Sequence, residues 1–307
     1  MEPKKTKIEA TYKSMDTEEP IDIYFYRPIG YQCALLAERL RITPNTITVF
    51  SIFIGAFAGL LFYYQDIWKN IAGMLLLVLA NILDSTDGQL ARMTNNKTKL
   101  GRILDGLAGN VWFIIIYVVL VFRCVNHDID NTVVWIVGSF AGLSHITHAA
   151  IADYYRNIHL YFMDYGHGGE FDHTKQIVQE IKTTPWRNFV KKIMLYFYWN
   201  YTNQQESLTP SFQKFIKQVR QSFPNSEIPG KLCETFRAGS KPLMKYTNIL
   251  QFNTRVIALF VCLLINRPFY YFLFDLIVLN SIMVYMIIKH EKMSKQLLKT
   301  VVHDNNG

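Results

Sequence analysis

The chain has 307 residues, of which 50% are hydrophobic, 14% are aromatic and 18% are charged, and its formal net charge is +8. The apolar residues gather into runs of about twenty, the length that crosses a bilayer, so the pattern excludes an ordinary soluble domain. A basic balance in a membrane protein favours an anionic membrane surface or anionic substrates. No nucleic-acid partner is expected, because the polar region mixes both signs of charge and carries no binding motif.

The N-terminal part predicts a polar tail followed by a helix at the membrane interface. Residues 1–20 are polar and lack the apolar core of a signal peptide. Residues 21–40 alternate apolar and polar side chains in a helical pattern, which predicts an amphipathic helix lying on the membrane. The side chains that carry this pattern are Tyr31, Leu35, Leu36, Arg39 and Leu40.

Six apolar runs predict an all-α membrane protein with six transmembrane helices. Thr43, Pro44 and Asn45 supply a cap and a turn before the first span. The fifth span is the least regular, because Asn253 and Arg255 lie inside it. The predicted spans cover about residues 45–64, 69–91, 102–123, 132–155, 248–265 and 268–289.

These elements divide the chain into four regions. Residues 1–40 form the tail and the juxtamembrane helix, and residues 41–163 contain the first four spans. Residues 164–247 form a polar insertion, and residues 248–307 hold the last two spans and a basic tail. Basic residues favour the side of the membrane that carries the termini and the insertion, so we expect that side to be cytoplasmic.

The sequence pattern of the polar insertion predicts that part of it is helical. A helical pattern extends over about residues 174–200. The stretch KKIMLYFYWNYTNQ at 191–204, which overlaps the end of this pattern, places aromatic residues either at the membrane surface or in a small packed core, and the sequence does not distinguish the two. The four cysteines of the chain are far apart and are expected to be reduced packing residues.

A cluster of acidic residues marks the cytoplasmic ends of the second and third spans. Asp84 and Asp87 are three residues apart, and Gly101, Asp105 and Gly109 recur every four residues, so each set shares one helix face. Because the turn between the spans is short, we expect the two faces to oppose each other as an antiparallel helix pair. Carboxylates at the edge of hydrocarbon are costly, and a hard divalent cation such as magnesium or manganese would compensate them.

Small and basic residues accompany the acidic cluster. The glycines and alanines on these faces either leave room for a bulky ligand or serve tight helix packing. The basic residues either suit a polyanion such as a diphosphate or act as a topology signal. They are Arg92, Lys97, Lys99 and Arg102.

The stretch from Asp84 to Gly109 resembles the signature of the integral-membrane CDP-alcohol phosphotransferases, D-x2-D-G-x2-A-R-x8-G-x3-D-x3-D. A lead-in before the first span, with Arg27-Pro28 and TPNTIT at 43–48, is similar to that family as well. The resemblance covers residues 21–163 well and the last two spans weakly. The signature positions are Asp84, Asp87, Gly88, Ala91, Arg92, Gly101 and Asp105.

The resemblance implies an enzyme that transfers a phospho-alcohol group from a CDP-alcohol to an acceptor hydroxyl and releases CMP, in phospholipid or head-group synthesis. One of the two substrates would be a lipid, and the enzyme would be a homodimer. It implies two divalent ions, magnesium or manganese, held by Asp84, Asp87 and Asp105. Gly88, Ala91 and Gly101 would let the nucleotide approach the helices, and Arg92 and Arg102 would help to hold phosphates.

The chain departs from the signature at its fourth acidic position, where Gly109 replaces an aspartate that the family is thought to use as a metal ligand and general base. A replacement base would have to come from elsewhere, and a histidine suits that role. The candidates are His145, His148 and Asp153, followed by Glu170 and Asp172.

Other hypotheses remain open beside such an active variant. Gly109 could be a substitution that cripples an ordinary enzyme, or the chain could be a silent family member that still binds metal or nucleotide. Acidic residues inside a membrane also mark ion-coupled transporters, although there they are expected near the middle of spans and beside broken helices.

Overall fold

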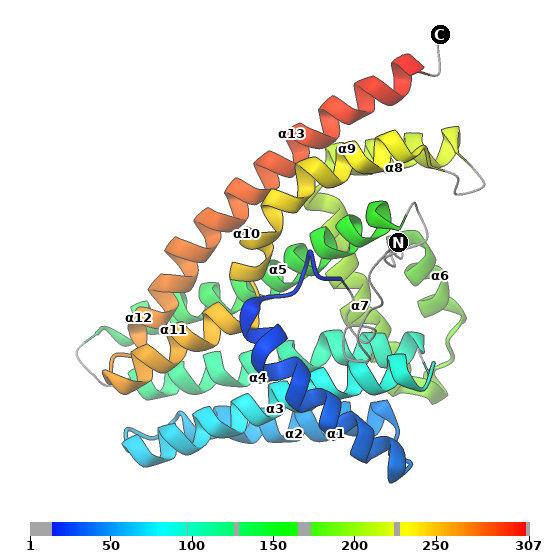
Figure 1. Cartoon of the computed structure of the whole chain (residues 1–307). Helices are drawn as coiled ribbons and strands as arrows, with labels where there is room; N and C mark the ends of the chain where they lie inside the picture. Colours follow the sequence, from blue (N-terminus) through cyan, green and yellow to red (C-terminus); the bar gives the residue numbers. More distant parts are fainter. Residues whose placement is uncertain (1–13, 97, 126–128, 165–172, 224–227, 305–307) are drawn as a thin grey trace. The chain divides into compact units, whose positions relative to one another are not determined.

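The computed structural model describes residues 14–96, 98–125, 129–164, 173–223 and 228–304, and every regular element in these ranges is helical (Figure 1). In chain order the main helices are α1 (Arg27–Arg39), α2 (Pro44–Leu61), α3 (Ile67–Met93), α4 (Lys99–Cys124), α5 (Asn131–Met163), α6 (Thr174–Thr183), α7 (Phe189–Leu208), α8 (Pro210–Ser222), α9 (Gly230–Ser240), α10 (Met244–Ile249), α11 (Phe252–Leu264), α12 (Phe269–Leu273) and α13 (Asn280–Asp304). A π-helical turn, Asp22–Tyr26, precedes α1, and another, Phe274–Leu279, joins α12 to α13.

Six helical segments among the described residues are long and apolar enough to cross a membrane, which confirms the predicted number. Two predicted boundaries differ from the structure. The predicted fifth span, 248–265, contains a break after Ile249, and α11 begins only at Phe252. The residues predicted as a basic tail continue the last helix, because α13 extends to Asp304.

The chain forms two compact units. The first comprises Met1–His145 with Phe252–Ile277, and the second comprises Ile146–Gln251 with Val278–Gly307.

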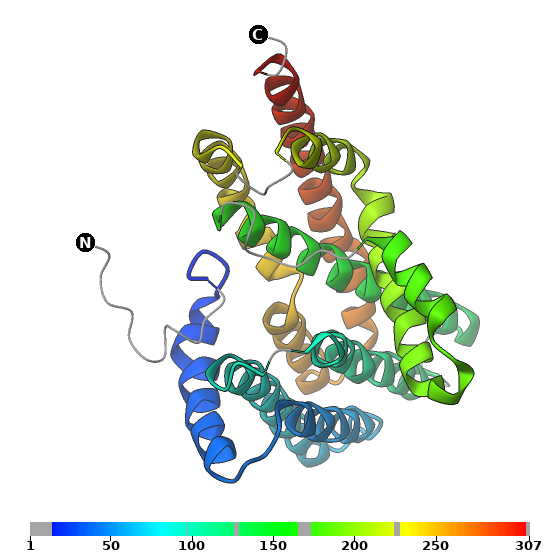
Figure 2. The ribbon, with the colours of Figure 1, turned by 90° about the vertical axis from the view of Figure 1, so that its right-hand side faces the viewer.

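In the first unit, α2 packs against both α3 and α4, and α1 packs on α3 (Figure 2). The helix α2 can approach closely because two of its glycines face large side chains of α4. A Cβ on Gly55 would lie 2.4 Å from the Trp112 side chain, and one on Gly59 would lie 3.1 Å from that of Ile116. By contrast, α3 and α4 contact each other little. The antiparallel pair expected from the sequence is therefore a three-helix arrangement in which α2 lies beside both partners.

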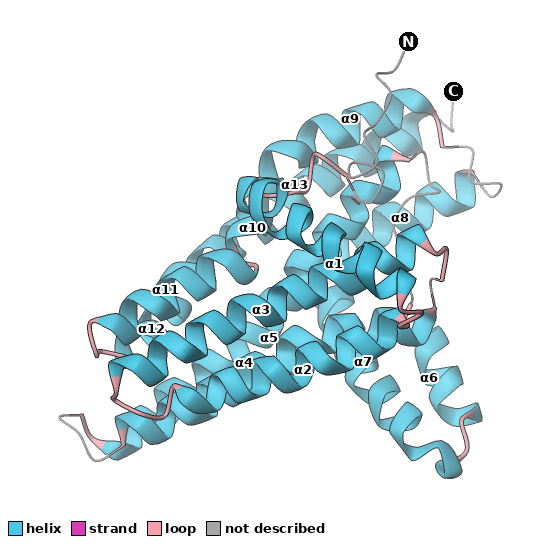
Figure 3. Cartoon of the chain, turned by 60° about the horizontal axis from the view of Figure 1, so that its bottom comes forward, coloured by secondary structure: helices cyan, strands magenta, loops and turns pink. Residues whose placement is uncertain are grey.

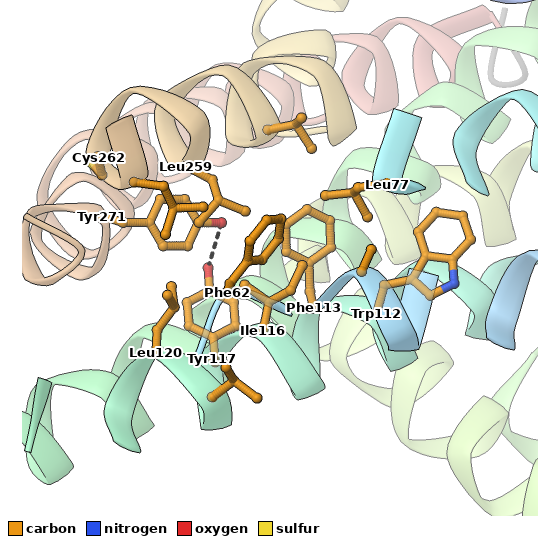
Figure 4. Packing of buried hydrophobic residues seen from close by; sticks show 14 of the residues in the cluster. Phe62, Leu77, Trp112, Phe113, Ile116, Tyr117, Leu120, Leu259, Cys262 and Tyr271 are labelled. Carbon is orange, nitrogen blue, oxygen red and sulfur yellow. Dashed lines mark hydrogen bonds between the residues drawn. The ribbon is translucent and has the colours of Figure 1, made fainter. Parts of the chain in front are cut away.

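A hydrophobic core joins α2, α3 and α4 to α11 and α12 within this unit (Figure 4). Three buried polar side chains in this unit form a paired network, as burial away from water favours. Arg255 of α11 forms an ion pair with Asp275 at 2.6 Å, and the Tyr117 hydroxyl donates to the other carboxylate oxygen at 2.7 Å. Arg123 at the end of α4 is buried and donates a hydrogen bond to the Phe62 carbonyl at 2.8 Å.

The N-terminal helix α1 exists as predicted, but its contact face differs from the simple amphipathic expectation. Its buried residues are the small Gly30, Ala34 and Ala37, which let α1 approach α3 closely. The large apolar side chains Leu36 and Leu40 point outward and are exposed. Such an outward apolar face suits contact with lipid.

The second unit gives the polar insertion a packed core. Aromatic rings from α5, α8 and α9 stack there, with the centroids of Phe162 and Phe236 4.0 Å apart and the rings of Phe215 and Phe236 nearly parallel. The helix α8 packs along α13, whose Glu291 carboxylate accepts hydrogen bonds from the first backbone amides of α8. The insertion and the C-terminal helix thus fold together.

Candidate active site

The three predicted aspartates lie together at the ends of α3 and α4. Asp84, Asp87 and Asp105 each offer a carboxylate oxygen, and these oxygens lie within 4.8 Å of one another. Asp87 is buried, whereas Asp84 and Asp105 are accessible to solvent. Three carboxylates this close repel one another unless a cation compensates their charge. Their oxygen atoms are the donor type that magnesium and manganese prefer.

The most buried of these carboxylates is held by α2. Thr48 Oγ1 lies 2.5 Å from Asp87 Oδ2 and donates a hydrogen bond to it. The threonine is itself placed by the lead-in motif, because the Thr43 side chain caps α2 and Pro44 is its first residue. Thr48 was not among the predicted site residues, although its place in the TPNTIT motif was a signal that could have found it.

The glycines of the site fall into two groups according to the space around them. A Cβ added to Gly109 would meet nothing within 4 Å, and at Gly88 it would meet only the Arg92 guanidinium, at 3.4 Å. These two positions therefore border open or adjustable space. At Gly101 a Cβ would lie 2.8 Å from Asn45 Oδ1 of α2, so this glycine serves a close contact between helices.

Basic side chains accompany the aspartates. The Arg92 guanidinium folds back along α3 over Gly88. The negative charges of Asp87 and Asp105 attract it. Ala91 and Arg102 are half-buried on the same two helices. Lys97 and the side chain of Lys99 lie outside the described residues.

A second arginine reaches this region from the N-terminal segment. Arg27, the first residue of α1, makes two hydrogen bonds to the Glu18 carboxylate, at 2.9 and 2.8 Å. The positive charge of Arg27 repels that of Arg92. The Arg27 carbonyl also accepts a hydrogen bond from Gln89 of α3, at 3.1 Å. The Arg-Pro element of the lead-in therefore lies against the helix that carries Asp84 and Asp87.

The candidate replacement bases have different surroundings. His145 is buried against α4, where its ring centroid lies 4.4 Å from that of Phe113, the residue one helical turn beyond Gly109. His148 Nε2 lies 2.8 Å from Asn280 Oδ1 in the second unit. Asp153, also in that unit, accepts a hydrogen bond from Asn157.

The two remaining candidates cannot be placed. Glu170 and Asp172 lie outside the described residues. Of the five, only His145 belongs to the same compact unit as the three aspartates among the residues that the structure describes.

Comparison with known proteins identifies this part of the chain. Residues 41–163 match the family model of the CDP-alcohol phosphatidyltransferases, which confirms the family predicted from the signature. The match contains α2, α3, α4 and α5 and all three aspartates. Six apolar helical segments within the described part of the chain, together with a domain of this membrane-enzyme family, identify an integral membrane protein.

Curated relatives match the chain over a short stretch. A CDP-diacylglycerol–serine O-phosphatidyltransferase of Helicobacter pylori is 36% identical over 74 residues, 24% of this chain and 30% of that protein. A CDP-diacylglycerol–glycerol-3-phosphate 3-phosphatidyltransferase of Escherichia coli is 36% identical over 68 residues, 22% of this chain and 37% of that protein. An uncharacterized protein of Aquifex aeolicus is 37% identical over 67 residues, 22% of this chain and 33% of that protein. The matches thus span only about a third of each relative's length.

Proposed function

We propose that the chain transfers a phospho-alcohol group from a CDP-alcohol to an acceptor hydroxyl, with release of CMP, in the synthesis of phospholipids or their head groups. The observation that carries the proposal is the convergence of Asp84, Asp87 and Asp105 within a domain that matches the CDP-alcohol phosphatidyltransferases. The names of the serine and glycerol-3-phosphate relatives support a CDP-linked lipid donor and a small polar acceptor.

The three carboxylates suit a pair of divalent cations. Their oxygens lie close enough together to bind the same cation. The hydrogen bond from Thr48 fixes the orientation of the Asp87 carboxylate. Magnesium or manganese held there would supply positive charge to the diphosphate oxygens and to the leaving CMP.

The protein's own residues would position the substrates. The open space at Gly109 and the movable Arg92 side chain at Gly88 leave room for a nucleotide close to α3 and α4. Arg92 presents a planar guanidinium, which binds phosphate oxygens through paired hydrogen bonds. The acceptor oxygen would form a bond to the phosphorus of the donor as the bond to CMP breaks, and the hydroxyl proton would pass to a base on the protein.

Among the candidate bases we favour His145. It packs one helical turn beyond Gly109 and shares a compact unit with the aspartates. An imidazole accepts a proton near neutral pH, which an amide or a glycine does not. His148 and Asp153 have partners in the second unit and are the weaker candidates.

We propose further that both termini and the aspartates face the cytoplasm and that the enzyme works as a homodimer. This orientation is supported by the lysines and arginines of the N-terminal segment, of the turn between α3 and α4 and of the C-terminal helix. A cytoplasmic site at a helix end would receive one substrate from the lipid and the other from water.

The test is CMP release by the purified full chain in nanodiscs, with magnesium or manganese, a panel of CDP-alcohols and candidate acceptors. Asp105→Asn serves as the inactive control, and His145→Gln is compared with His148→Gln over a range of pH. We expect wild type to release CMP with one substrate pair, Asp105→Asn to lose this activity, and only His145→Gln to remove the acidic limb of the pH profile.

Two outcomes would change the proposal. An unaltered pH profile in His145→Gln would exclude that residue as the base. Binding of a CDP-alcohol without CMP release in any pair would leave a silent family member, and neither binding nor release would end the enzyme hypothesis.

A further inference from the structure

An apolar helix face outside the active site lacks a partner among the residues that the structure describes. Helices α6 and α7 lie side by side as a hairpin in the second unit (Figure 3). From the turn of this hairpin onward, large apolar side chains point to solvent, with exposed fractions between 45% and 69%. This α7 aromatic face consists of Trp186, Phe189, Val190, Ile193, Tyr196 and Phe197.

Five residues of the α7 aromatic face, from Phe189 to Phe197, share one side of α7, and Trp186 lies in the 3-10 turn just before it. Their spacing repeats every three or four positions, so they form a single stripe along α7. The other side of α7 buries Lys192 and Leu195, and the neighbouring α6 buries Ile177 and Ile181. The hairpin thus has its own internal contact surface, and the exposed stripe is additional to it.

The structure holds the exposed tryptophan in place. Lys192 Nζ lies 4.4 Å from the centre of the Trp186 ring and donates a hydrogen bond to the Thr184 carbonyl at 3.1 Å. Trp186 is nevertheless 69% exposed. A tryptophan presented in this way is typical of the boundary between membrane and water.

The C-terminal half of α7 is hydrogen-bonded to α5, which is a candidate membrane span. The Tyr201 hydroxyl donates to the Ala149 carbonyl at 3.1 Å, and the Gln205 amide donates to the Ala150 carbonyl at 2.9 Å. In addition, α6 begins eleven residues after the end of α5, a distance of at most about 40 Å along an extended chain. A bilayer is therefore always within reach of the hairpin.

The charge of the hairpin favours an anionic partner. Residues 174–197 contain five basic residues and one acidic residue, Glu180, which pairs with Lys191 at 3.2 Å. Lys175 and Lys182 of α6 and Arg187 in the turn before α7 are exposed. An apolar stripe with basic residues at its border is the composition of helices that lie on anionic membranes.

We propose that the α7 aromatic face docks onto an anionic lipid surface, with Trp186 at the boundary and the basic side chains against the head groups. A second copy of the chain is a poorer occupant, because two such hairpins would bring like charges together. The docking would attach the second unit to the membrane through a contact that none of the six spanning segments provides.

The test places a nitroxide label at single positions of the full chain in nanodiscs. Cysteine is introduced as Ile193→Cys or Phe197→Cys on the stripe, and as Lys191→Cys beside it, with Cys33→Ser removing the native cysteine that is not buried. Collision rates with oxygen, which partitions into lipid, and with a water-soluble nickel chelate are compared. Nanodiscs with and without an anionic phospholipid are used.

We expect the two stripe positions to have an oxygen-to-nickel ratio severalfold above that of Lys191→Cys, and Arg187→Glu combined with Lys182→Glu to reduce this ratio. Equal ratios at all three positions would overturn the proposal, and ratios independent of the anionic lipid would overturn its electrostatic part. Line broadening that disappears on mixing with unlabelled protein would assign the face to a second copy. Because the readout is immersion and not CMP release, failure of this proposal and failure of the proposed activity are distinguishable.

Discussion

Thr48 of α2 donates a hydrogen bond to the buried carboxylate of Asp87 of α3, with 2.5 Å between Thr48 Oγ1 and Asp87 Oδ2. This contact joins the lead-in motif before the first span to the acidic cluster. In the sequence the two motifs are separated by the rest of α2 and the first part of α3, yet they meet within the first unit. The lead-in therefore helps to build the site.

Removal of this hydrogen bond is expected to weaken metal binding. In Thr48→Val the Asp87 carboxylate loses a donor that fixes its orientation, and loss of such a supporting contact lowers metal affinity about tenfold or more. A manganese titration of the purified protein, followed by calorimetry, measures the change. Ser51→Ala is the matched control, because the Ser51 hydroxyl donates to the Thr48 carbonyl and not to Asp87. An unchanged affinity in Thr48→Val would show that the contact does not support the metal site.

The open position at Gly109 predicts that an aspartate can be introduced without a steric penalty. Since a Cβ there meets nothing within 4 Å, Gly109→Asp should fold normally. If the missing carboxylate limits the rate, CMP release should rise about 10²- to 10⁴-fold, the usual contribution of a positioned base. Gly106→Asp is the matched control, because Gly106 is equally open but lies outside the signature stripe. A similar rate in wild type and in Gly109→Asp would mean that the chain already has an effective base.

The buried ion pair between Arg255 and Asp275 predicts a strong dependence of stability on both partners. In Arg255→Met the Asp275 carboxylate stays buried without its cation, and the free energy of unfolding should fall by about 3–5 kcal/mol. The double variant Arg255→Met/Asp275→Leu should recover most of this loss, because no uncompensated charge remains. Thermal unfolding in detergent of wild type, Arg255→Met, Asp275→Leu and the double variant completes a double-mutant cycle. Additive losses in the double variant would contradict a coupled pair.

Close helix contact makes Gly55 sensitive to the smallest enlargement. In Gly55→Ala the new methyl group would meet Trp112 at 2.4 Å, so the indole or α2 must shift, at a cost of about 1–3 kcal/mol. Gly106→Ala should be neutral or stabilising, since its position is open and alanine favours a helix by about 1 kcal/mol. Comparison of the two unfolding midpoints tests the packing of α2 on α4, and equal midpoints would argue against it.

The surroundings of Glu206 in α7 predict a pH-dependent contribution to stability. Burial raises the pKa of Glu206, but hydrogen bonds from His173 and Thr174 outweigh it and hold the pKa below its ordinary value. Because the folded pKa is depressed, the stabilisation is complete above the ordinary pKa of about 4.5 and is lost as the pH falls through the folded value.

In Glu206→Gln the unfolding midpoint should therefore drop at pH 7, by an amount equivalent to about 1 kcal/mol, and should approach that of wild type in acid. The measurement is thermal unfolding of both proteins at several pH values. A difference that stays constant with pH would mean that the charge of Glu206 does not contribute.

The sequence alone determined the class of fold and the grouping of the three aspartates. Runs of about twenty apolar residues predict six spans because the thickness of the hydrocarbon sets the length of a spanning helix. Six candidate spans occur among the described residues, although the predicted fifth span is broken after Ile249. The spacing from Asp84 to Asp105 predicts the acidic cluster because helical periodicity places residues three and four apart on one face, and the three carboxylates do converge.

Only the tertiary structure decided which contacts surround the site and which glycines leave it open. Thr48 reaches Asp87 and Asn45 fills the space at Gly101, because α2 packs between partners that periodicity alone does not specify. Gly109 borders open space, although the same residue type at Gly55 lies against an indole ring. Local sequence fixes the face on which a residue lies, but the neighbour across that face depends on how distant helices pack.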